Sequence, residues 1–316
     1  MKLVYIGVLA VLVSFSAFSQ KTKSNTFSDV TTIRLSASSG SAKFIKSSGR
    51  EINVTLEYTY SDDEFEYKME KNGSTLNLEE KFHRNYIRGN SHWSLEIPDG
   101  MDVRFNSGSG DLEIDGLEID IKSNQGSGSI LATNTKGEFT LITGSGDHEI
   151  KNHAGELDLT TGSGEIIVSE ASGELNLTTG SGDIEINIAT GNLSAVVGSG
   201  NIDARGIELL DDGRFVSGSG DVDVRLNAAT GATLSIASGS GDATLDFGGQ
   251  TINATIVVEA NERNGRIVAP FEFDSEEIIE RSGYGNNTIR KTVRLGSGKA
   301  EVKVATGSGT VEIKQD

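Results

Sequence analysis

The stretch TTGSGEIIVSEASGELNLTTGSGDIEI, residues 160–186, contains Thr-Gly-Ser-Gly twice, and the second copy starts 18 residues after the first. Gly-Ser-Gly recurs along the chain, and its first five intervals are all 18 residues. A flexible linker keeps its composition but has no fixed phase, so this regular interval predicts a structural repeat. The triplet begins, in chain order, at Gly108, Gly126, Gly144, Gly162, Gly180, Gly198, Gly218, Gly239, Gly296 and Gly307.

Each 18-residue unit divides into two halves. The residues after a triplet alternate between polar and apolar, as in DIEI at 183–186. Nine residues after the last glycine of a triplet, another glycine starts a similar alternation, as in GELNL at 173–177. Alternation with period two predicts short strands. The glycines between the strands are expected to be turn residues with positive φ.

A strand-turn unit of this size can bury its apolar side chains only by stacking on its neighbours. In a stack, four inward columns of mostly aliphatic side chains would lie between two parallel sheets. One of these columns would contain Ile130, Ile166, Ile184 and Ile202. The sequence therefore predicts an all-β fold, a parallel β-solenoid with 18-residue coils of two nine-residue half-repeats each. Because open sheet ends promote polymerisation, β-rich caps are expected at both ends.

The chain is expected to have four parts. Residues 1–19 resemble a signal peptide, with Lys2 before an apolar run that is too short to span a bilayer. Cleavage would leave Gln20 as the N-terminus, and a retained anchor is the alternative. A β-rich cap is expected over 20–105, the regular solenoid over 106–250, and an excursion with capping coils over 251–316. Within that excursion, a short helical turn is expected between Asp274 and Glu280.

Export, charge and cysteine content narrow the location and the partners. The mature chain is expected in the periplasm, at the outer membrane or outside the cell, with no membrane span after signal cleavage. The formal net charge of -18 would repel nucleic acid, so nucleic-acid binding is not expected. The absence of cysteine excludes disulfide bonds and a lipid-modified cysteine. Cations, basic proteins and polar glycans remain open as partners.

No catalytic or cofactor motif fits the triplets. Gly298-Lys299 lacks both the first glycine and the hydroxyl residue of a phosphate-binding loop, and the triplet serines are not in a Gly-x-Ser-x-Gly elbow. His148 stands where other coils have leucine or isoleucine. It is expected to be half-buried or to face an edge, without a partner for catalysis or metal binding. The sequence therefore predicts no enzyme activity and no cofactor.

Pairs of acidic residues follow the triplet in alternate coils. One interpretation is structural, because unit charges on strands about 4.8 Å apart repel, whereas charges at twice that spacing are largely screened. The other interpretation is a face that binds cations, calcium in particular. The candidate residues of this face are Asp111, Glu113, Asp147, Glu149, Asp183, Glu185, Asp221 and Asp223.

The repeated TGSGDIEI, as at 179–186, with GxLxL between copies, resembles the bacterial putative-adhesin family of β-strand-repeat proteins. It is also similar to the autotransporter-head putative adhesin domain of Bacteroidota. The resemblance covers about residues 30–316 and is strongest over 106–250. It implies an exported β-solenoid in a Gram-negative cell envelope, with no catalytic residues to transfer.

These features predict a non-catalytic adhesin or cell-envelope scaffold that presents a regular acidic and polar surface to a cell-surface glycan or an envelope protein. The alternatives are a glycan- or calcium-binding surface module and, less favoured, a β-helix enzyme that processes polysaccharide. Such an enzyme would need a groove with basic residues beside paired acids. The basic residues of the repeats, for example Lys122, Lys136, Lys151 and Arg205, are not expected to share a column.

Overall fold

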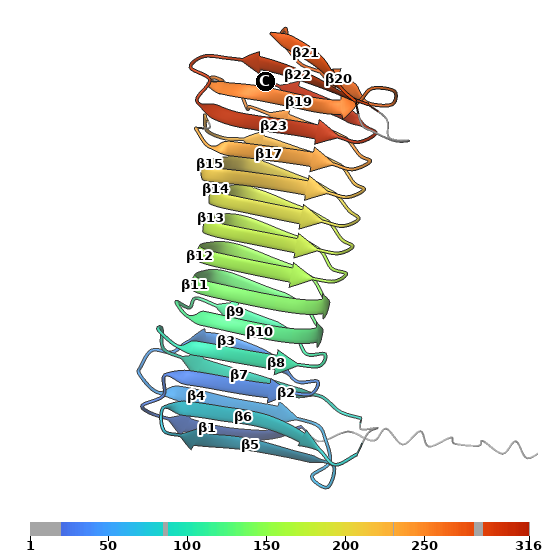
Figure 1. Ribbon diagram of the computed structural model, residues 1–316. Helices are drawn as coiled ribbons and strands as arrows, with labels where there is room; N and C mark the ends of the chain where they lie inside the picture. Colours follow the sequence, from blue (N-terminus) through green and yellow to red (C-terminus); the bar gives the residue numbers. More distant parts are fainter. Residues whose placement is uncertain (1–19, 85–87, 230, 281–286, 316) are drawn as a thin grey trace, which may run out of the picture.

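The computed structural model describes residues 20–84, 88–229, 231–280 and 287–315. In these residues the chain forms strands and no helix, and the strands pair, mostly in parallel, into one stack (Figure 1). The expectation of an all-β, mostly parallel fold is confirmed. The described residues contain no helix with the length and hydropathy needed to cross a membrane. The predicted signal peptide, residues 1–19, lies outside them.

The middle of the stack consists of long strands that each run along both sheets. They are 14 to 16 residues long, because the backbone bends in mid-strand while its pairing continues. The half of each strand that follows a triplet belongs to what we call sheet 1, and the half that precedes the next triplet belongs to sheet 2. The long strands are β11 (Ile130–Ser145), β12 (His148–Thr161), β13 (Ile166–Thr179), β14 (Ile184–Val197) and β15 (Ile202–Ser217).

Successive long strands pair in a constant register. Ile130 pairs with His148, His148 with Ile166, and Ile166 with Ile184, so each residue lies beside the one 18 positions further on. The expected inward columns are confirmed, and their aliphatic side chains are buried. A continuous apolar core therefore lies between sheets 1 and 2. In β15 the register shifts, because residues 210–212 bulge between the partners of Gly191 and Leu193.

The glycines have two roles, and only one matches the expectation. Those in the mid-strand bend have positive φ, for example 140° at Gly155 and 128° at Gly173. The expectation of positive φ is wrong for the triplets between residues 144 and 241, in which no glycine has it. A Cβ on Gly164 would lie 2.0 Å from the carbonyl oxygen of Gly146. The triplet glycines are therefore needed for close approach of neighbouring turns of chain.

At the N-terminal end, the order of strands in space differs from their order in the sequence. The strands are β1 (Lys21–Phe27), β2 (Thr32–Ala37), β3 (Ser41–Lys46), β4 (Ile52–Tyr58), β5 (Phe65–Asn72), β6 (Thr75–Phe82), β7 (Ser91–Ile97), β8 (Asp102–Ser107), β9 (Leu112–Asp115) and β10 (Asp120–Ser127). β2 lies between β8 and β6, since Leu35 pairs with Phe105 on one side and Leu78 on the other. β1 and β5, each antiparallel to its neighbour, form the outer edges (Figure 1).

Aromatic side chains fill much of the core of this end. Phe65 packs against Tyr58 and Tyr60, with ring centroids 4.9 Å apart in both pairs. Trp93 is fully buried, and its indole N–H donates a hydrogen bond of 2.9 Å to the Glu80 carboxylate. Among the described residues, this end therefore buries more aromatic rings than the middle of the stack, where Phe139 and Phe215 are buried.

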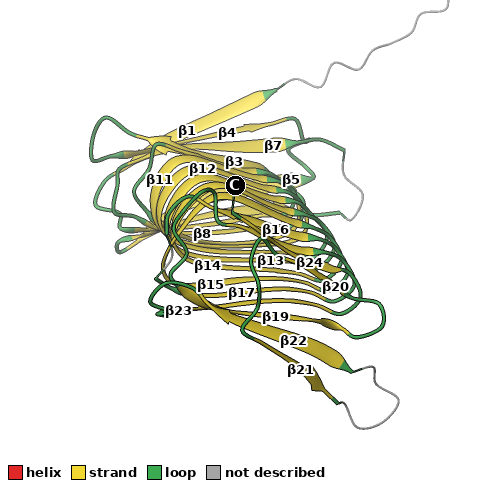
Figure 2. Cartoon of the chain, turned by 90° about the horizontal axis from the view of Figure 1, so that it is seen from above, coloured by secondary structure: helices red, strands yellow, loops and turns green. Residues whose placement is uncertain are grey.

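The C-terminal end has a similar insertion. Its strands are β16 (Val222–Leu226), β17 (Thr233–Ser238), β18 (Ala243–Asp246), β19 (Ala254–Asn261), β20 (Arg266–Val268), β21 (Ser275–Ile279), β22 (Thr288–Arg294), β23 (Ala300–Thr306) and β24 (Thr310–Lys314). β23 lies between β17 and β19, since Val304 pairs with Ile236 and with Val258. Seen from above, successive strands overlie one another and the loops lie at the margins (Figure 2).

The expected helical turn between Asp274 and Glu280 is wrong. Residues 275–279 of this segment form β21, which is antiparallel to β22 at the outer edge of sheet 2. Glu277 pairs in register with Arg290, and Arg290 Nη1 donates a hydrogen bond of 2.8 Å to it. The cross-strand charge pair explains why an acidic segment adopts an extended conformation here.

Candidate functional site

The eight candidate acids lie together on the outer side of sheet 1. They form two adjoining columns, one directly after the triplets and one two residues later on the strands. The first column holds Asp111, Asp147, Asp183 and Asp221, and the second holds Glu113, Glu149, Glu185 and Asp223.

The carboxylates of the first column bind the backbone of the next turn of chain. Asp147 Oδ1 accepts a hydrogen bond from the backbone N–H of Glu165 at 2.9 Å. The same contact recurs between side-chain oxygens of Asp111, Asp183, Asn201, Asp221 and Asp242 and the N–H groups of Ser129, Asn201, Asp221, Asp242 and Thr310. This bond is a second physical reason, beside charge spacing, for a short acid or amide after the triplet. Within the described part of the chain, no group of three or more acids and histidines is arranged to hold a metal ion.

Most acids of the second column pair with side chains on the same face. Glu113 accepts a hydrogen bond from Lys43 Nζ at 2.7 Å, and Glu185 accepts one from Asn187 Nδ2 at 2.6 Å. Glu149 forms an ion pair with Lys151. Exposed ion pairs contribute only about 0–1 kcal/mol each, so this column is a charged surface more than a source of stability.

Basic residues do share a column, and the expectation that they would not is wrong. Lys151 stands in the same column as Arg205, and Arg205 pairs directly with Arg225. The column continues through Asp246 to Lys314. The triplet intervals lengthen to 20 and 21 residues after Gly198, so a fixed period of 18 does not align Arg225 or Lys314 with the earlier basic residues.

The second acidic column and the basic column lie side by side in an open depression of about 300 Å³ near the C-terminal end of sheet 1. Arg205 Nη2 lies 2.5 Å from Asp203 Oδ2, and Arg225 Nε lies 3.5 Å from Asp246 Oδ2. The charged side chains that line the depression are Asp203, Arg205, Asp223, Arg225, Asp246 and Lys314. The sequence did not lead us to expect this combination of basic residues and acids in a depression. Among the described residues, a second such depression lies on sheet 2 beside Glu259, Arg290 and Lys303.

Two histidines lie inside β12. His148 is fully buried between Ile130 and Ile166, so the expected half-buried position is wrong. Its Nε2 lies 3.0 Å from Thr143 Oγ1, and this polar partner permits full burial. Burial lowers the pKa of His148 and of His153 to about 4, so both imidazoles are neutral at neutral pH. The core separates them from the outer face of sheet 1.

Hydroxyl groups before the triplets form an internal polar column. Thr161 Oγ1 donates to the Gly146 carbonyl at 3.0 Å, and Thr179 Oγ1 donates to the Gly164 carbonyl at 2.9 Å. Ser217 and Ser238 make the same contact at 2.7 and 2.8 Å. The sequence contains the signal for this column, namely a recurring threonine or serine directly before Gly-Ser-Gly.

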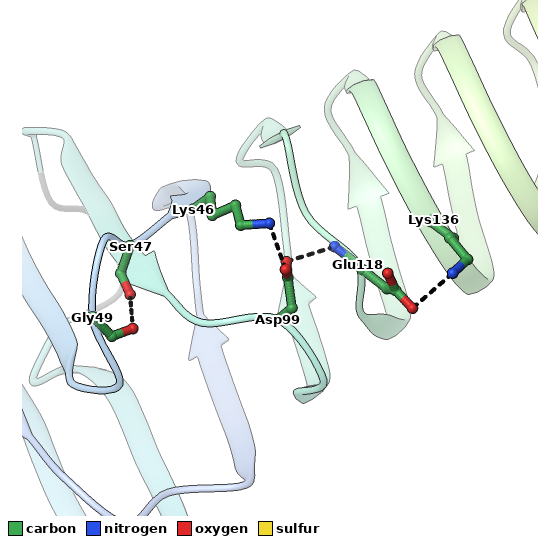
Figure 3. Close-up of polar contacts among 6 residues, drawn as sticks. All are labelled: Lys46, Ser47, Gly49, Asp99, Glu118 and Lys136. Atoms are coloured by element: carbon green, nitrogen blue, oxygen red, sulfur yellow. Dashed lines mark hydrogen bonds and ion pairs between the residues drawn. The ribbon is translucent and has the colours of Figure 1, made fainter.

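Polar contacts also tie the N-terminal end to the regular stack (Figure 3). Asp99 accepts hydrogen bonds from the backbone N–H of Glu118 at 3.0 Å and from Lys46 Nζ at 2.5 Å. The hydrogen bond from the Glu118 N–H has the larger effect and the one from Lys46 the smaller, and both lower the pKa of the Asp99 carboxyl. Lys136 Nζ donates to the Glu118 carboxylate at 2.9 Å. The contacts link four separate turns of the chain along one edge.

The chain is similar to solved structures of low sequence identity. A putative adhesin from Parabacteroides distasonis has 13% identity and a TM-score of 0.37, with 94% of this chain and 98% of that chain covered. A putative adhesin from Bacteroides fragilis has 12% identity and a TM-score of 0.31, with 93% and 97% covered. A putative cell adhesion protein from Clostridium sporogenes has 12% identity and a TM-score of 0.25, with 94% and 100% covered. No curated protein matches the chain.

The family comparison covers the N-terminal end and the regular stack together. The profile described as Toastrack DUF4097 matches residues 30–264, which is most of the chain. The stacked, mostly parallel strands fit a toastrack-like fold. The chain therefore belongs to the Toastrack DUF4097 family.

Proposed function

We propose that this protein is an exported, non-catalytic adhesin or cell-envelope scaffold that presents the outer face of sheet 1. The observation that carries this proposal is the series of side-chain-to-backbone hydrogen bonds after the triplets, from Asp111 to Asp242. These bonds fix polar groups at regular intervals along a stiff stack. A surface of this kind suits repeated, weak contacts with a cell-surface glycan or an envelope protein.

The same proposal includes the finer architecture. The stack is a solenoid with 18-residue coils, its ends at 20–105 and 251–316 serve as caps, and residues 1–19 direct export to the periplasm, the outer membrane or the cell exterior. Non-catalytic presentation is favoured over catalysis because most acids on this face are already engaged in backbone bonds or ion pairs, as Asp147 and Glu113 are.

Deletion of the gene in the producing bacterium tests the proposal. We expect weaker attachment of the cells to surfaces, restored by the full chain and not by a chain that lacks residues 1–19. Unchanged attachment with altered envelope-stress signalling would favour an internal scaffold over an adhesin. A deletion that changes neither property would contradict the proposal.

A further inference from the structure

The depression near the C-terminal end of sheet 1 combines two columns of opposite charge. Arg205 and Arg225 are register partners on β15 and β16, and Asp203 and Asp223 are register partners two residues earlier. Neighbouring strands are about 4.8 Å apart, and like charges directly opposite each other are unfavourable. The fold therefore holds two guanidinium groups side by side and two carboxylates side by side. A ligand group that pairs with either set would reduce the repulsion between the like charges.

The guanidinium groups are accessible. The side chains of Arg205 and Arg225 are 68% and 58% exposed. Among the described residues, Arg225 forms an ion pair with Asp246 through Nε, which lies 3.5 Å from Asp246 Oδ2. Two neighbouring guanidinium groups with free donors match a carboxylate, which accepts hydrogen bonds through both of its oxygens.

Asp203 and Asp223, beside the two arginines, can accept further hydrogen bonds. Asp203 Oδ1 is buried and lacks a hydrogen-bond partner within the described residues, although Oδ2 contacts Arg205. Asp223 also lines the depression and is exposed. Hydroxyl groups of a ligand would donate hydrogen bonds to the exposed Asp223 carboxylate, and also to Asp203 Oδ1 once the Asp203 side chain turns toward the depression. The depression is therefore complementary to a ligand that carries both an anionic group and hydroxyl groups.

We propose that this depression binds an acidic polysaccharide, with one sugar carboxylate held between Arg205 and Arg225 and sugar hydroxyls donating to Asp203 and Asp223. Lys314 at the far end of the same column would meet the next anionic group along the polymer. This inference rests on the proposed role of sheet 1 as a presenting face and names the class of ligand. The net charge of -18 opposes the approach of a polyanion, but salt screens charges beyond about 8 Å, so the groups around the depression dominate at contact.

Titration of the full mature chain, residues 20–316, with trigalacturonate tests this site by calorimetry. Galactotriose, which lacks the carboxylates, serves as the matched neutral ligand. We expect trigalacturonate to bind and galactotriose to bind at least about tenfold more weakly, because the charge-assisted hydrogen bonds are lost. The double variant Arg205→Gln/Arg225→Gln should weaken trigalacturonate binding by a similar factor.

The control is the double variant Lys122→Gln/Lys136→Gln, which removes the same charge at residues that do not line the depression. It should bind trigalacturonate within about twofold of the parent chain, and melting curves should show that both double variants fold. The inference is overturned if the parent does not bind at millimolar concentration, if galactotriose binds equally well, or if both double variants weaken binding equally. A gene deletion that changes neither cell attachment nor envelope-stress signalling would contradict the proposed function, whereas a positive titration would still support this site.

Discussion

At the scale of single residues, the mid-strand bend places one residue in the left-handed α conformation in each of six successive turns of chain, in addition to bend glycines such as Gly155. Six residues spaced 18 apart have φ between 53° and 71°, namely Gly116, Asn134, Asn152, Glu170, Ile188 and Gly206. Glycine and asparagine adopt this conformation readily, whereas a β-branched residue does so at a cost. The Ile188 side chain is also 57% exposed, so its packing offsets little of the backbone strain.

Replacement of Ile188 by Asn is expected to stabilise the protein. The free energy of unfolding in urea should rise by about 1 kcal/mol, because the strain of a β-branched residue at positive φ is removed. Ile142→Asn is the matched control, since Ile142 is also exposed but lies outside the left-handed column. A control that gains as much as Ile188→Asn would show that loss of exposed apolar surface, and not backbone strain, is responsible.

His148 should make the protein less stable in acid. Its folded pKa of about 4 lies below the unfolded value of about 6.5, so the unfolded chain binds more protons between these pH values. The stabilisation is complete above pH 6.5 and is lost as the pH falls toward 4. Asp147, the charged neighbour that raises this pKa, opposes the larger effect of burial.

His148→Ile, which matches the residues on both sides in the column, should remove the part of this dependence that His148 causes and leave the part that His153 causes. Denaturant titrations at pH 7.5 and 4.5 should show that the variant loses less stability than the parent on acidification, by up to about 3 kcal/mol. His92→Gln, at an exposed position, should follow the parent at both pH values. Parallel curves for the parent and His148→Ile would mean that the buried imidazole is not the cause.

At the scale of elements, the repeat period predicts the strand pairs of the middle and fails at the ends. Alternation after each triplet, as in 183–186, is enough to place Ile166 beside Ile184, because both strands meet the same core. Nothing in the period indicates that β2 inserts between β6 and β8, since this pairing depends on residues about 40 and 70 positions away. Tertiary pairing decides those strands, and a local pattern does not contain it.

The candidate site was predictable to a similar extent. The acidic columns follow from the period, because their residues keep a fixed distance from the triplets. The pairing of Arg205 with Arg225 does not, because longer loops intervene and only the strand register restores the alignment. The full burial of His148 also depends on a contact that the column alone does not reveal, the hydroxyl of Thr143.

Close approach at the triplets gives a test of the stacking itself. Gly182→Ala should destabilise the protein by about 2–3 kcal/mol, because the new Cβ would lie 2.0 Å from the Gly164 carbonyl oxygen. Gly49→Ala is the matched control, since no atom lies within 4 Å of a Cβ there. Thermal melting of both variants measures the difference. Equal melting temperatures for the two would refute close stacking at the triplets.

At the scale of the whole molecule, the stack combines a middle of near-neighbour contacts with ends that are closed by distant ones. Core partners in the middle are 18 residues apart, as are Ile166 and Ile184, whereas Ile33 and Val103 are 70 apart and Ile236 and Val304 are 68 apart. Pairing of distant residues is slow to form because loop closure costs entropy. The inserted strands thereby join each end to the middle as one unit.

Deletion of residues 299–316 should uncouple the C-terminal end from the rest. β23 and β24 would be lost, and β17 and β18 would no longer contact β19 and β20 through the buried side chains of Val302, Val304 and Val311. Hydrogen exchange should then increase over 254–294 and remain slow over 130–217, because the middle depends on its nearest neighbours. Deletion of residues 20–27 is the control: it removes β1, which lies at an edge, and should expose β4 alone. If exchange over 254–294 stays as slow as in the parent, β23 and β24 do not hold that end in place.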